Sequence, residues 1–344
     1  MTHEFLKIID SYKKAHERNI QTVLATIVYT EGSSYRKQGT RMLIDQYGNT
    51  TGALSGGCVE QEVIRQSTSV FSSGCPKVFK YDGRYRLGCE GSIYILLERF
   101  SPNSELIDLI ENAIEQRQSF YLTSSFTTEE ISNPDFGTSF EFKDTMIYHS
   151  NYDEESVNPI FKQLIEPLNR LCIFGVEHDA EKLSQMASFL GWEVIIIGSE
   201  YSSVNGTDFP FAKSVLTMKP EDLDQDLFCS HTAIMVMSHN YSKDLRFLLS
   251  ILPSKARYIG LLGPVHRREK LLNAIIESDL IFDDSLFDKF HGPAGLAIGS
   301  KTPEEIALSI MAEITAIWRR TLPQESVSAD LQSVPTKQVN AKVV

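Results

Sequence analysis

Four continuous apolar runs of strand length lie in the C-terminal half of this chain. Helical segments such as 180–190 separate these runs, which cover residues 171–175, 193–198, 231–238 and 256–263. Strands without a polar face that alternate with helices are typical of a parallel sheet covered on both sides. The pattern predicts an α/β fold, with a Rossmann-like, doubly wound parallel-sheet domain over residues 170–322. The polar tail at 323–344 is expected to be disordered.

The N-terminal half follows another pattern. It predicts an amphipathic helix over 4–18, a β-branched strand at 21–30 and a hairpin that turns at Gly48-Asn49. Further helices are expected near 58–72 and 104–118, and further strands near 77–81, 92–99, 119–126 and 140–148. This order predicts an α+β domain with a mixed sheet over residues 1–150. Residues 151–169 are acidic, contain Pro159 and Pro167, and are expected to form a linker.

A glycine pair followed by a cysteine is the main chemical signal of the first half. A thiol at Cys58 would lie at a helix N-terminus, where unpaired N–H groups and the peptide dipoles favour the thiolate. Gly56 and Gly57 allow a ligand to approach the backbone closely, and Glu60 would act in the first turn as a cap, a proton acceptor or both. The alternative is that Cys58 is packed as a small hydrophobic residue.

A second thiol, Cys89, is also flanked by glycines, in Gly88-Cys89-Glu90-Gly91. Together with Cys58 it would offer two sulfurs to a soft ligand such as molybdenum or transferred sulfur. Packing in the core is again the alternative for Cys89.

Charge and composition exclude several classes of protein. The formal net charge of −12 argues against a sequence-independent nucleic-acid binder. No apolar run approaches membrane-spanning length, and the N-terminus has no apolar core of signal-peptide type, so we expect a cytoplasmic protein. The five cysteines follow no pairwise spacing and are expected to be reduced thiols.

The turn after the first apolar run of the second domain is a weak dinucleotide motif. Only Gly175 fits the GxGxxG pattern, because Glu177 stands where the second glycine is expected and would place a carboxylate near the phosphate site. After the second run, Glu200 is the only acidic residue near the position that usually binds ribose. Binding of NAD(P) is therefore an alternative that this motif supports poorly.

Other strand ends of this domain carry polar side chains. His239 follows one apolar run, and Arg267, Arg268 and Lys270 follow another. The carboxyl ends of parallel strands are where open α/β sheets bind ligands, and arginine pairs bind phosphate well. The alternative is a solvated basic start of a helix. The loop at 291–301, which precedes a helix that starts at Thr302, is a further candidate for an anion cradle.

The chain resembles the XdhC/CoxI family of xanthine dehydrogenase accessory factors in an ordered set of motifs. These are GALSGGCVE, LGCEG, SHNYSKDLRFL, YIGLLGPVHRREKL and GPAGLAIGSKTPEEIALSIMAEI. The resemblance implies a maturation factor that is not itself catalytic. Such a factor binds the molybdenum cofactor (molybdopterin) transiently while a cysteine desulfurase helps to install its terminal sulfur, and passes it to a molybdenum hydroxylase client. It also implies a homodimer.

By this resemblance Cys58 carries over as a metal ligand or protecting thiol, within the segment Ser55–Glu60. The chain keeps His178 where family turns read G-A-G-H, but Gly175 is the only glycine of that turn left. Our leading hypothesis is a cofactor chaperone in which glycine N–H groups contact the pterin and basic residues bind its phosphate. An NAD(P)-dependent oxidoreductase and a docking scaffold without cofactor are the alternatives.

Overall fold

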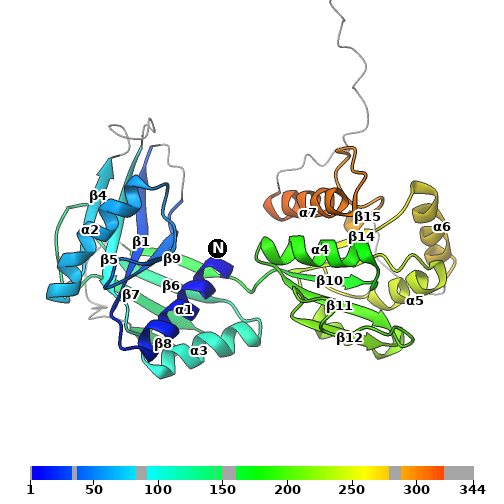
Figure 1. The fold of residues 1–344 in the computed structure, drawn as a ribbon, viewed down its shortest axis with the longest axis horizontal. Helices are drawn as coiled ribbons and strands as arrows, with labels where there is room; N and C mark the ends of the chain where they lie inside the picture. The colour runs from blue at the N-terminus through cyan, green and yellow to red at the C-terminus, as the bar shows by residue number, and fades with distance from the viewer. Residues whose placement is uncertain are drawn as a thin grey trace, which may run out of the picture. The chain divides into compact units, whose positions relative to one another are not determined.

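The computed structural model describes residues 2–32, 37–82, 91–143, 145–148, 160–278 and 288–320. The chain divides into two compact units (Figure 1). The first comprises Met1–Asn169 with Gly191–Glu193, and the second comprises Arg170–Leu190 with Val194–Val344. Cys89 and the tail expected at 323–344 lie outside the described residues.

The first unit is an α+β structure, as expected, but its strands form two antiparallel sheets instead of one mixed sheet. The five-stranded sheet has the order β3-β2-β1-β5-β4, and the four-stranded sheet has the order β8-β7-β6-β9. Hairpins join β2 to β3 and β7 to β8, so these neighbouring strands run in opposite directions. The elements are α1 (Thr2–Glu17), β1 (Thr22–Glu31), β2 (Arg41–Asp45), β3 (Thr50–Gly52), α2 (Cys58–Ser73), β4 (Lys77–Asp82), β5 (Ser92–Arg99), α3 (Ser104–Glu115), β6 (Phe120–Ser125), β7 (Gly137–Phe142), β8 (Thr145–Tyr148) and β9 (Ile160–Ile165).

Strand β9 corrects the expected linker at 151–169. It pairs with β6 from Phe120↔Ile165 to Ser125↔Ile160, so part of that segment belongs to the four-stranded sheet. Its side chains alternate between exposed and less exposed positions up to the buried Ile165, because successive residues of a strand point to opposite faces of the sheet. Ile160 and Leu164 lie on the exposed side, so no clean alternation of apolar and polar residues marks the strand.

A polar seam lies between the apolar clusters that join the two sheets. Glu98 on β5 is fully buried, and its carboxylate accepts hydrogen bonds from the Thr138 hydroxyl at 2.6 Å and the Thr138 N–H at 2.9 Å. Arg41 on β2, 6% exposed, donates to the Gly39 carbonyl and to Gln163 on β9. Burial raises the pKa of Glu98 to about 7, although the Thr138 hydrogen bonds and the charge of Arg41 oppose the shift.

The other face of the five-stranded sheet is covered by α2. Val59, Val63 and Val70 of this helix pack against β1 and β2 residues such as Ile27 and Met42. This packing fixes the start of α2, and with it the position of Cys58, against the sheet.

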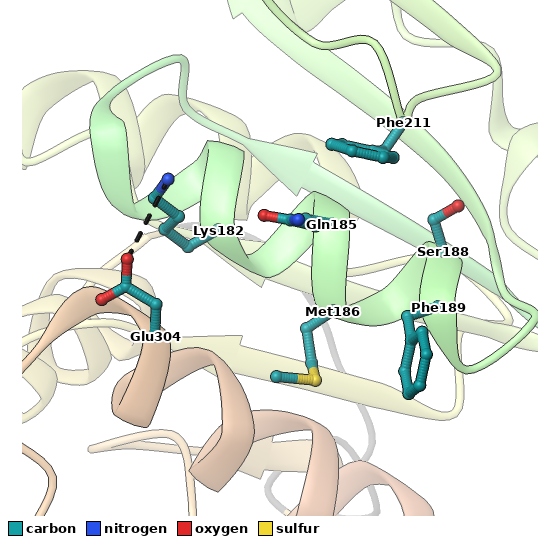
Figure 2. Close-up of a pocket in the computed structure, with 7 residues that line it drawn as sticks. All are labelled: Lys182, Gln185, Met186, Ser188, Phe189, Phe211 and Glu304. Carbon is teal, nitrogen blue, oxygen red and sulfur yellow. Dashed lines mark ion pairs between the residues drawn. The ribbon is translucent and has the colours of Figure 1, made fainter.

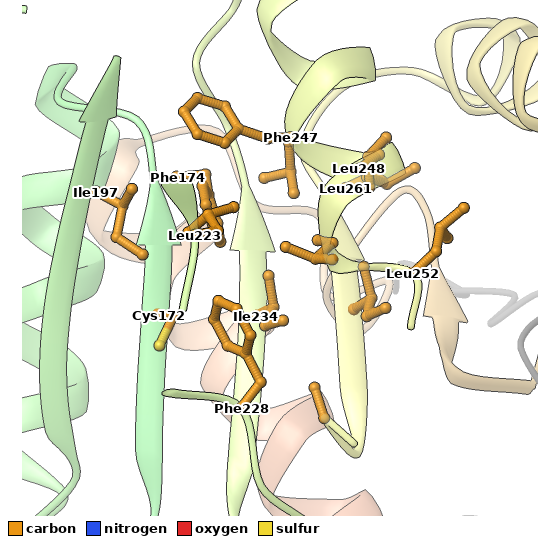
Figure 3. Packing of buried hydrophobic residues seen from close by; sticks show 14 of the residues in the cluster. Cys172, Phe174, Ile197, Leu223, Phe228, Ile234, Phe247, Leu248, Leu252 and Leu261 are labelled. Atoms are coloured by element: carbon orange, nitrogen blue, oxygen red, sulfur yellow. The ribbon is translucent and has the colours of Figure 1, made fainter. Parts of the chain in front are cut away.

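The second unit is the expected Rossmann-like domain. Its sheet has the order β12-β11-β10-β13-β14-β15, and parallel pairing joins β10 to β13, β13 to β14, and β14 to β15. Figure 3 shows the core on one face of this sheet, where Phe247 of α5 packs among strand residues such as Phe174 and Ile234. Leu271 and Ile275 of α6 belong to the same core. The elements are β10 (Arg170–Phe174), α4 (His178–Phe189), β11 (Glu193–Ser199), β12 (Ser214–Met218), η2 (Pro220–Asp222), η3 (Gln225–Leu227), β13 (Thr232–Val236), α5 (Tyr241–Ile251), β14 (Tyr258–Leu261), α6 (Val265–Ile276), β15 (Phe290–His291) and α7 (Pro303–Arg319).

The strand order reverses between β10 and β13. The chain leaves β10 toward β11 and β12, then returns to place β13 on the other side of β10. In open α/β sheets such a switch point forms a crevice at the carboxyl ends of the two strands. The loops after Phe174 and after Val236 therefore lie at the edge where open α/β sheets bind ligands.

Candidate functional site

Cys58 is the first residue of α2, and its side chain is exposed. Leu54 on one side and Val59 on the other are buried in the core under the five-stranded sheet. These two anchors hold the intervening segment, Ser55–Cys58, at the surface. We call this segment the cysteine loop. The interpretation of Cys58 as a packed hydrophobic residue is therefore wrong.

Gly57 sets the backbone geometry of the cysteine loop. Its φ of 51° and ψ of −64° place it at the centre of a γ-turn, and the Cys58 N–H donates to the Gly56 carbonyl at 2.6 Å. A Cβ built on Gly56 or Gly57 would meet no atom within 4 Å. The backbone of the loop is therefore open to close approach from outside.

Glu60 holds the cysteine loop from the first turn of α2. Its Oε1 accepts the N–H groups of Leu54 at 3.0 Å and Ser55 at 2.7 Å. Its Oε2 is buried and has no hydrogen-bond partner among the described residues. Glu60 thus holds the segment that precedes the helix, and it does not cap the N-terminus of α2 itself.

The other described thiols lie in different surroundings. Cys172 is buried within β10, and Cys75 and Cys229 are partly buried. Because Cys89 lies outside the described residues, its pairing with Cys58 stays a prediction. Within the described ranges, no group of three or more His, Cys, Asp or Glu side chains is placed to bind a metal ion.

In the second unit, Gly175 lies at the switch point after β10. Its φ is +145°, and a Cβ at this position would lie 2.7 Å from the carbonyl oxygen of Met237, which follows β13. Only glycine allows the two strand ends to approach this closely. This glycine could be identified from the strand–turn–helix context of the sequence alone.

The two histidines of the predicted site lie at this edge and contact the first turn of α4. His239, with a left-handed φ of 54°, places Nε2 3.2 Å from Asp179 Oδ2. His178 places Nδ1 3.5 Å from Glu181 Oε2. Asp179 was missed from sequence, because a carboxylate in the first turn of a helix is ordinary and nothing local links it to a residue after β13.

The two arginines of the predicted phosphate site make different contacts. Arg267 donates from Nη2 to Asp244 Oδ2 at 2.6 Å, and Asp244 is only 2% exposed. Arg268 lies over Gly292, where a Cβ would come within 2.9 Å of its Cδ, and its buried Nε has no partner among the described residues. Arg267 is thus held in a structural ion pair, which leaves Arg268 as the available guanidinium.

The loop before α7 is held by the chain itself. Glu305 Oε2 accepts the N–H groups of Lys301 at 2.7 Å and Thr302 at 3.1 Å, which completes the predicted capping box. These hydrogen bonds lower the pKa of Glu305. The Glu313 carboxylate accepts from the Tyr258 hydroxyl at 2.6 Å and the Gly295 N–H at 2.9 Å. The anion cradle expected at this helix start is therefore filled by the protein's own carboxylate.

A groove of about 520 Å³ on the outer side of α4 was not predicted (Figure 2). Phe189 and Phe211 are 83% and 45% exposed, and a 3.9 Å ion pair joins Lys182 to Glu304 at its other end. The sequence signal for it is a phenylalanine at the last position of α4, Phe189. The lining residues are Lys182, Gln185, Met186, Ser188, Phe189, Phe211 and Glu304.

An antiparallel α+β unit with an exposed helix-start thiol, followed by a Rossmann-type unit, defines the class of this protein. The family model for the XdhC Rossmann domain matches residues 171–314, and the model for the XdhC and CoxI family matches residues 15–82, which include the cysteine loop. The chain belongs to this XdhC family, as its motifs predicted.

Relatives and a solved structure agree over most of the chain. The chain is 31% identical over 323 residues to a Bacillus subtilis protein named as a probable xanthine dehydrogenase subunit, covering 87% of this chain and 94% of that protein. It is 22% identical over 300 residues to the molybdenum cofactor insertion chaperone PaoD of Escherichia coli, covering 86% and 83%. A crystal structure described as a xanthine dehydrogenase from Bacillus halodurans superposes with a TM-score of 0.76 at 26% identity, covering 93% and 98%.

Among the helices that the described residues form, none is both long enough and apolar enough to cross a bilayer.

Proposed function

We propose that this chain is a molybdenum cofactor-binding chaperone that assists sulfuration of the cofactor and its insertion into a xanthine dehydrogenase-type molybdenum hydroxylase. The observation that carries the proposal is the exposed thiol of Cys58, presented on an open glycine turn. Two similar proteins support it, since one is named a molybdenum cofactor insertion chaperone and the other a probable xanthine dehydrogenase subunit.

The residues of the cysteine loop fit such a cofactor. A thiol is a soft ligand suited to molybdenum or sulfur, and Cys58 is accessible at the start of a helix. The cofactor supplies its own metal and its own redox chemistry, so the protein needs to provide contacts and not a full set of metal ligands.

Each residue of the loop has a part in this proposal. Cys58 holds the molybdenum or its sulfur, and the open backbone at Gly56 and Gly57 lies against the pterin. Glu60 keeps Ser55 in place through its backbone hydrogen bond and so fixes the approach to the thiol. None of these contacts requires a chemical step by the protein, which suits a carrier.

The second unit contributes a separate set of candidates. We propose Arg268 as an anion-binding residue of this unit, because Arg267 is engaged by Asp244. We propose His178 and His239 as ligand-contacting residues at the edge of this sheet, where each imidazole also contacts a carboxylate of α4. The partners that we propose are a molybdenum hydroxylase client, a cysteine desulfurase and a second copy of this chain.

The test is activation of a cofactor-free xanthine dehydrogenase-type hydroxylase. Wild type, Cys58→Ala and Cys75→Ala are purified without oxygen from cells that make molybdopterin, then mixed with the apo-hydroxylase. We expect wild type and Cys75→Ala to restore xanthine oxidation and Cys58→Ala to lose most of this ability. Cys75 is a matched control, since it is a partly exposed thiol in the same unit.

Two results would contradict the proposal. Equal activation by Cys58→Ala and wild type would remove the thiol from the mechanism. Capture of the hydroxylase by a chain that never contains pterin would favour a docking scaffold. Light scattering of the purified chain tests the proposed homodimer independently.

A further inference from the structure

A side chain of the protein itself lies in the turn after β10, at the position where other Rossmann units bind phosphate. In dinucleotide-binding units the phosphates lie on the glycine turn and on the N-terminus of the next helix. Here Glu177 is the N-cap residue of α4, in extended conformation. Its side chain therefore starts at the place where a phosphate is normally received.

The carboxylate of Glu177 folds back onto the turn. Its Oε2 accepts the N–H of Val176 at 2.9 Å. The same oxygen lies 3.0 Å from the place that a Cβ on Gly175 would occupy. Both observations put a carboxylate oxygen against the Gly175-Val176 turn, which is where a phosphate oxygen would lie.

The other charges at this helix start are paired with one another. Asp179 contacts His239, and Glu181 contacts His178 and Lys182, the latter at 3.4 Å. Glu177 has no ion pair among the described residues, so its charge is stabilised by the Val176 N–H and by the positive end of the α4 dipole. A bound phosphate would depend on these same interactions.

The ribose side of the crevice is also occupied. A Cβ on Gly198, near the end of β11, would lie 2.9 Å from the Cβ of Ser202 and 3.2 Å from Val176 Cγ1. Glu200, the only acidic candidate for the ribose hydroxyls, has its Oε1 3.7 Å from Arg246 Nη1. The protein's own side chains thus fill both positions that a dinucleotide uses first.

We propose that Glu177 is a built-in anion that occupies the phosphate position of the Rossmann turn and so excludes phosphate-bearing nucleotides from that turn. The exclusion has two parts, because the carboxylate takes the hydrogen-bond donor and also repels a second negative group at contact distance. Removing the carboxylate frees the Val176 N–H and removes one negative charge from the start of α4. Glu177 is then the residue that determines which ligands this crevice rejects.

The experiment is a calorimetric titration of the full chain with ADP, in wild type, Glu177→Gly, Glu177→Ser and Glu181→Gln. Glycine restores the residue that the dinucleotide pattern expects, and serine is a favourable N-cap that keeps the helix start. Glu181→Gln removes the same charge from the same helix turn but leaves the glycine turn filled. Circular dichroism and thermal melting confirm that each variant is folded.

We expect wild type and Glu181→Gln to bind ADP no tighter than about 1 mM, and both Glu177 variants to bind at least about tenfold tighter. Tight binding of ADP by wild type would overturn the proposal. So would a folded Glu177→Ser protein that binds ADP no better than Glu181→Gln. Because none of these variants touches Cys58, failure here leaves the proposed chaperone function unaffected.

Discussion

At the scale of single residues, alanine substitutions at Gly56 and Gly57 test two different properties of the cysteine loop. The change at Gly57 tests its backbone conformation, and the change at Gly56 tests its accessibility. Only Gly57 has a left-handed φ, and a Cβ at either position would enter open space. We predict that Gly57→Ala lowers the free energy of unfolding by about 1–2 kcal/mol, because an L-residue is strained there. Gly56→Ala is expected to change it by less than about 0.5 kcal/mol. Urea denaturation measures both values.

Gly56→Ala also tests cofactor binding without a large change in stability. Gly56→Ala adds a methyl group to the open backbone beside Cys58 and is expected to lower the molybdopterin content of the purified protein. Full retention of cofactor by this stable variant would show that the pterin does not approach the loop backbone.

Glu60 stabilises the backbone that leads into α2. Its Oε1 receives two backbone N–H groups, so Glu60→Ala leaves both donors without a protein partner and is expected to cost about 1–3 kcal/mol of stability. Glu60→Gln retains a carbonyl acceptor and is expected to stay within about 1 kcal/mol of wild type. If guanidinium unfolding shows equal losses for the two variants, the charge of Glu60 matters and not its acceptor.

At the scale of elements, the pairing of β9 decides where the first unit ends. Its backbone pairs with β6, although the sequence predicted a linker there. We predict that the peptide covering 160–165 exchanges its amide hydrogens more slowly than an unpaired segment, as measured by hydrogen exchange with mass spectrometry. Exchange at the rate of an unstructured peptide would restore the linker interpretation.

Sequence predicted best those elements whose signals are local. The start of α7 follows from the capping box at Thr302, and the start of α2 at Cys58 comes directly after the glycine pair. Strand direction and the placement of β9 depend on pairing with segments far away in the chain, which no local pattern encodes. The same reason explains why Cys58 and Gly175 were identified, while the pairs Asp179–His239 and Asp244–Arg267 were not.

At the scale of the whole molecule, the polar seam makes the stability of the first unit depend on pH. The pKa of Glu98 rises from 4.5 to about 7, chiefly because burial disfavours its charged form. The folded state therefore binds this proton more tightly than the unfolded chain does, and its stabilising effect is lost as pH rises from 4.5 to 7. The loss is at most about 3 kcal/mol and levels off above that range.

Glu98→Gln tests this pH dependence, because it removes the titrating carboxyl. Arg41, the charged group among the described residues that acts on the Glu98 pKa, is present in both proteins. Chemical denaturation at a series of pH values is expected to show a smaller fall in stability for the variant than for wild type. Parallel curves for the two proteins would mean that Glu98 does not titrate in this range.

The proposed function depends on cofactor held at the cysteine loop of the first unit. The most direct measurement is the molar ratio of molybdopterin to protein in anaerobically purified wild type, Cys58→Ala and Cys75→Ala. We predict a clear, comparable pterin content in wild type and Cys75→Ala, and a content reduced by at least about tenfold in Cys58→Ala, equivalent to about 1.4 kcal/mol of lost affinity. Equal pterin content in all three proteins would contradict a cofactor held by the Cys58 thiol.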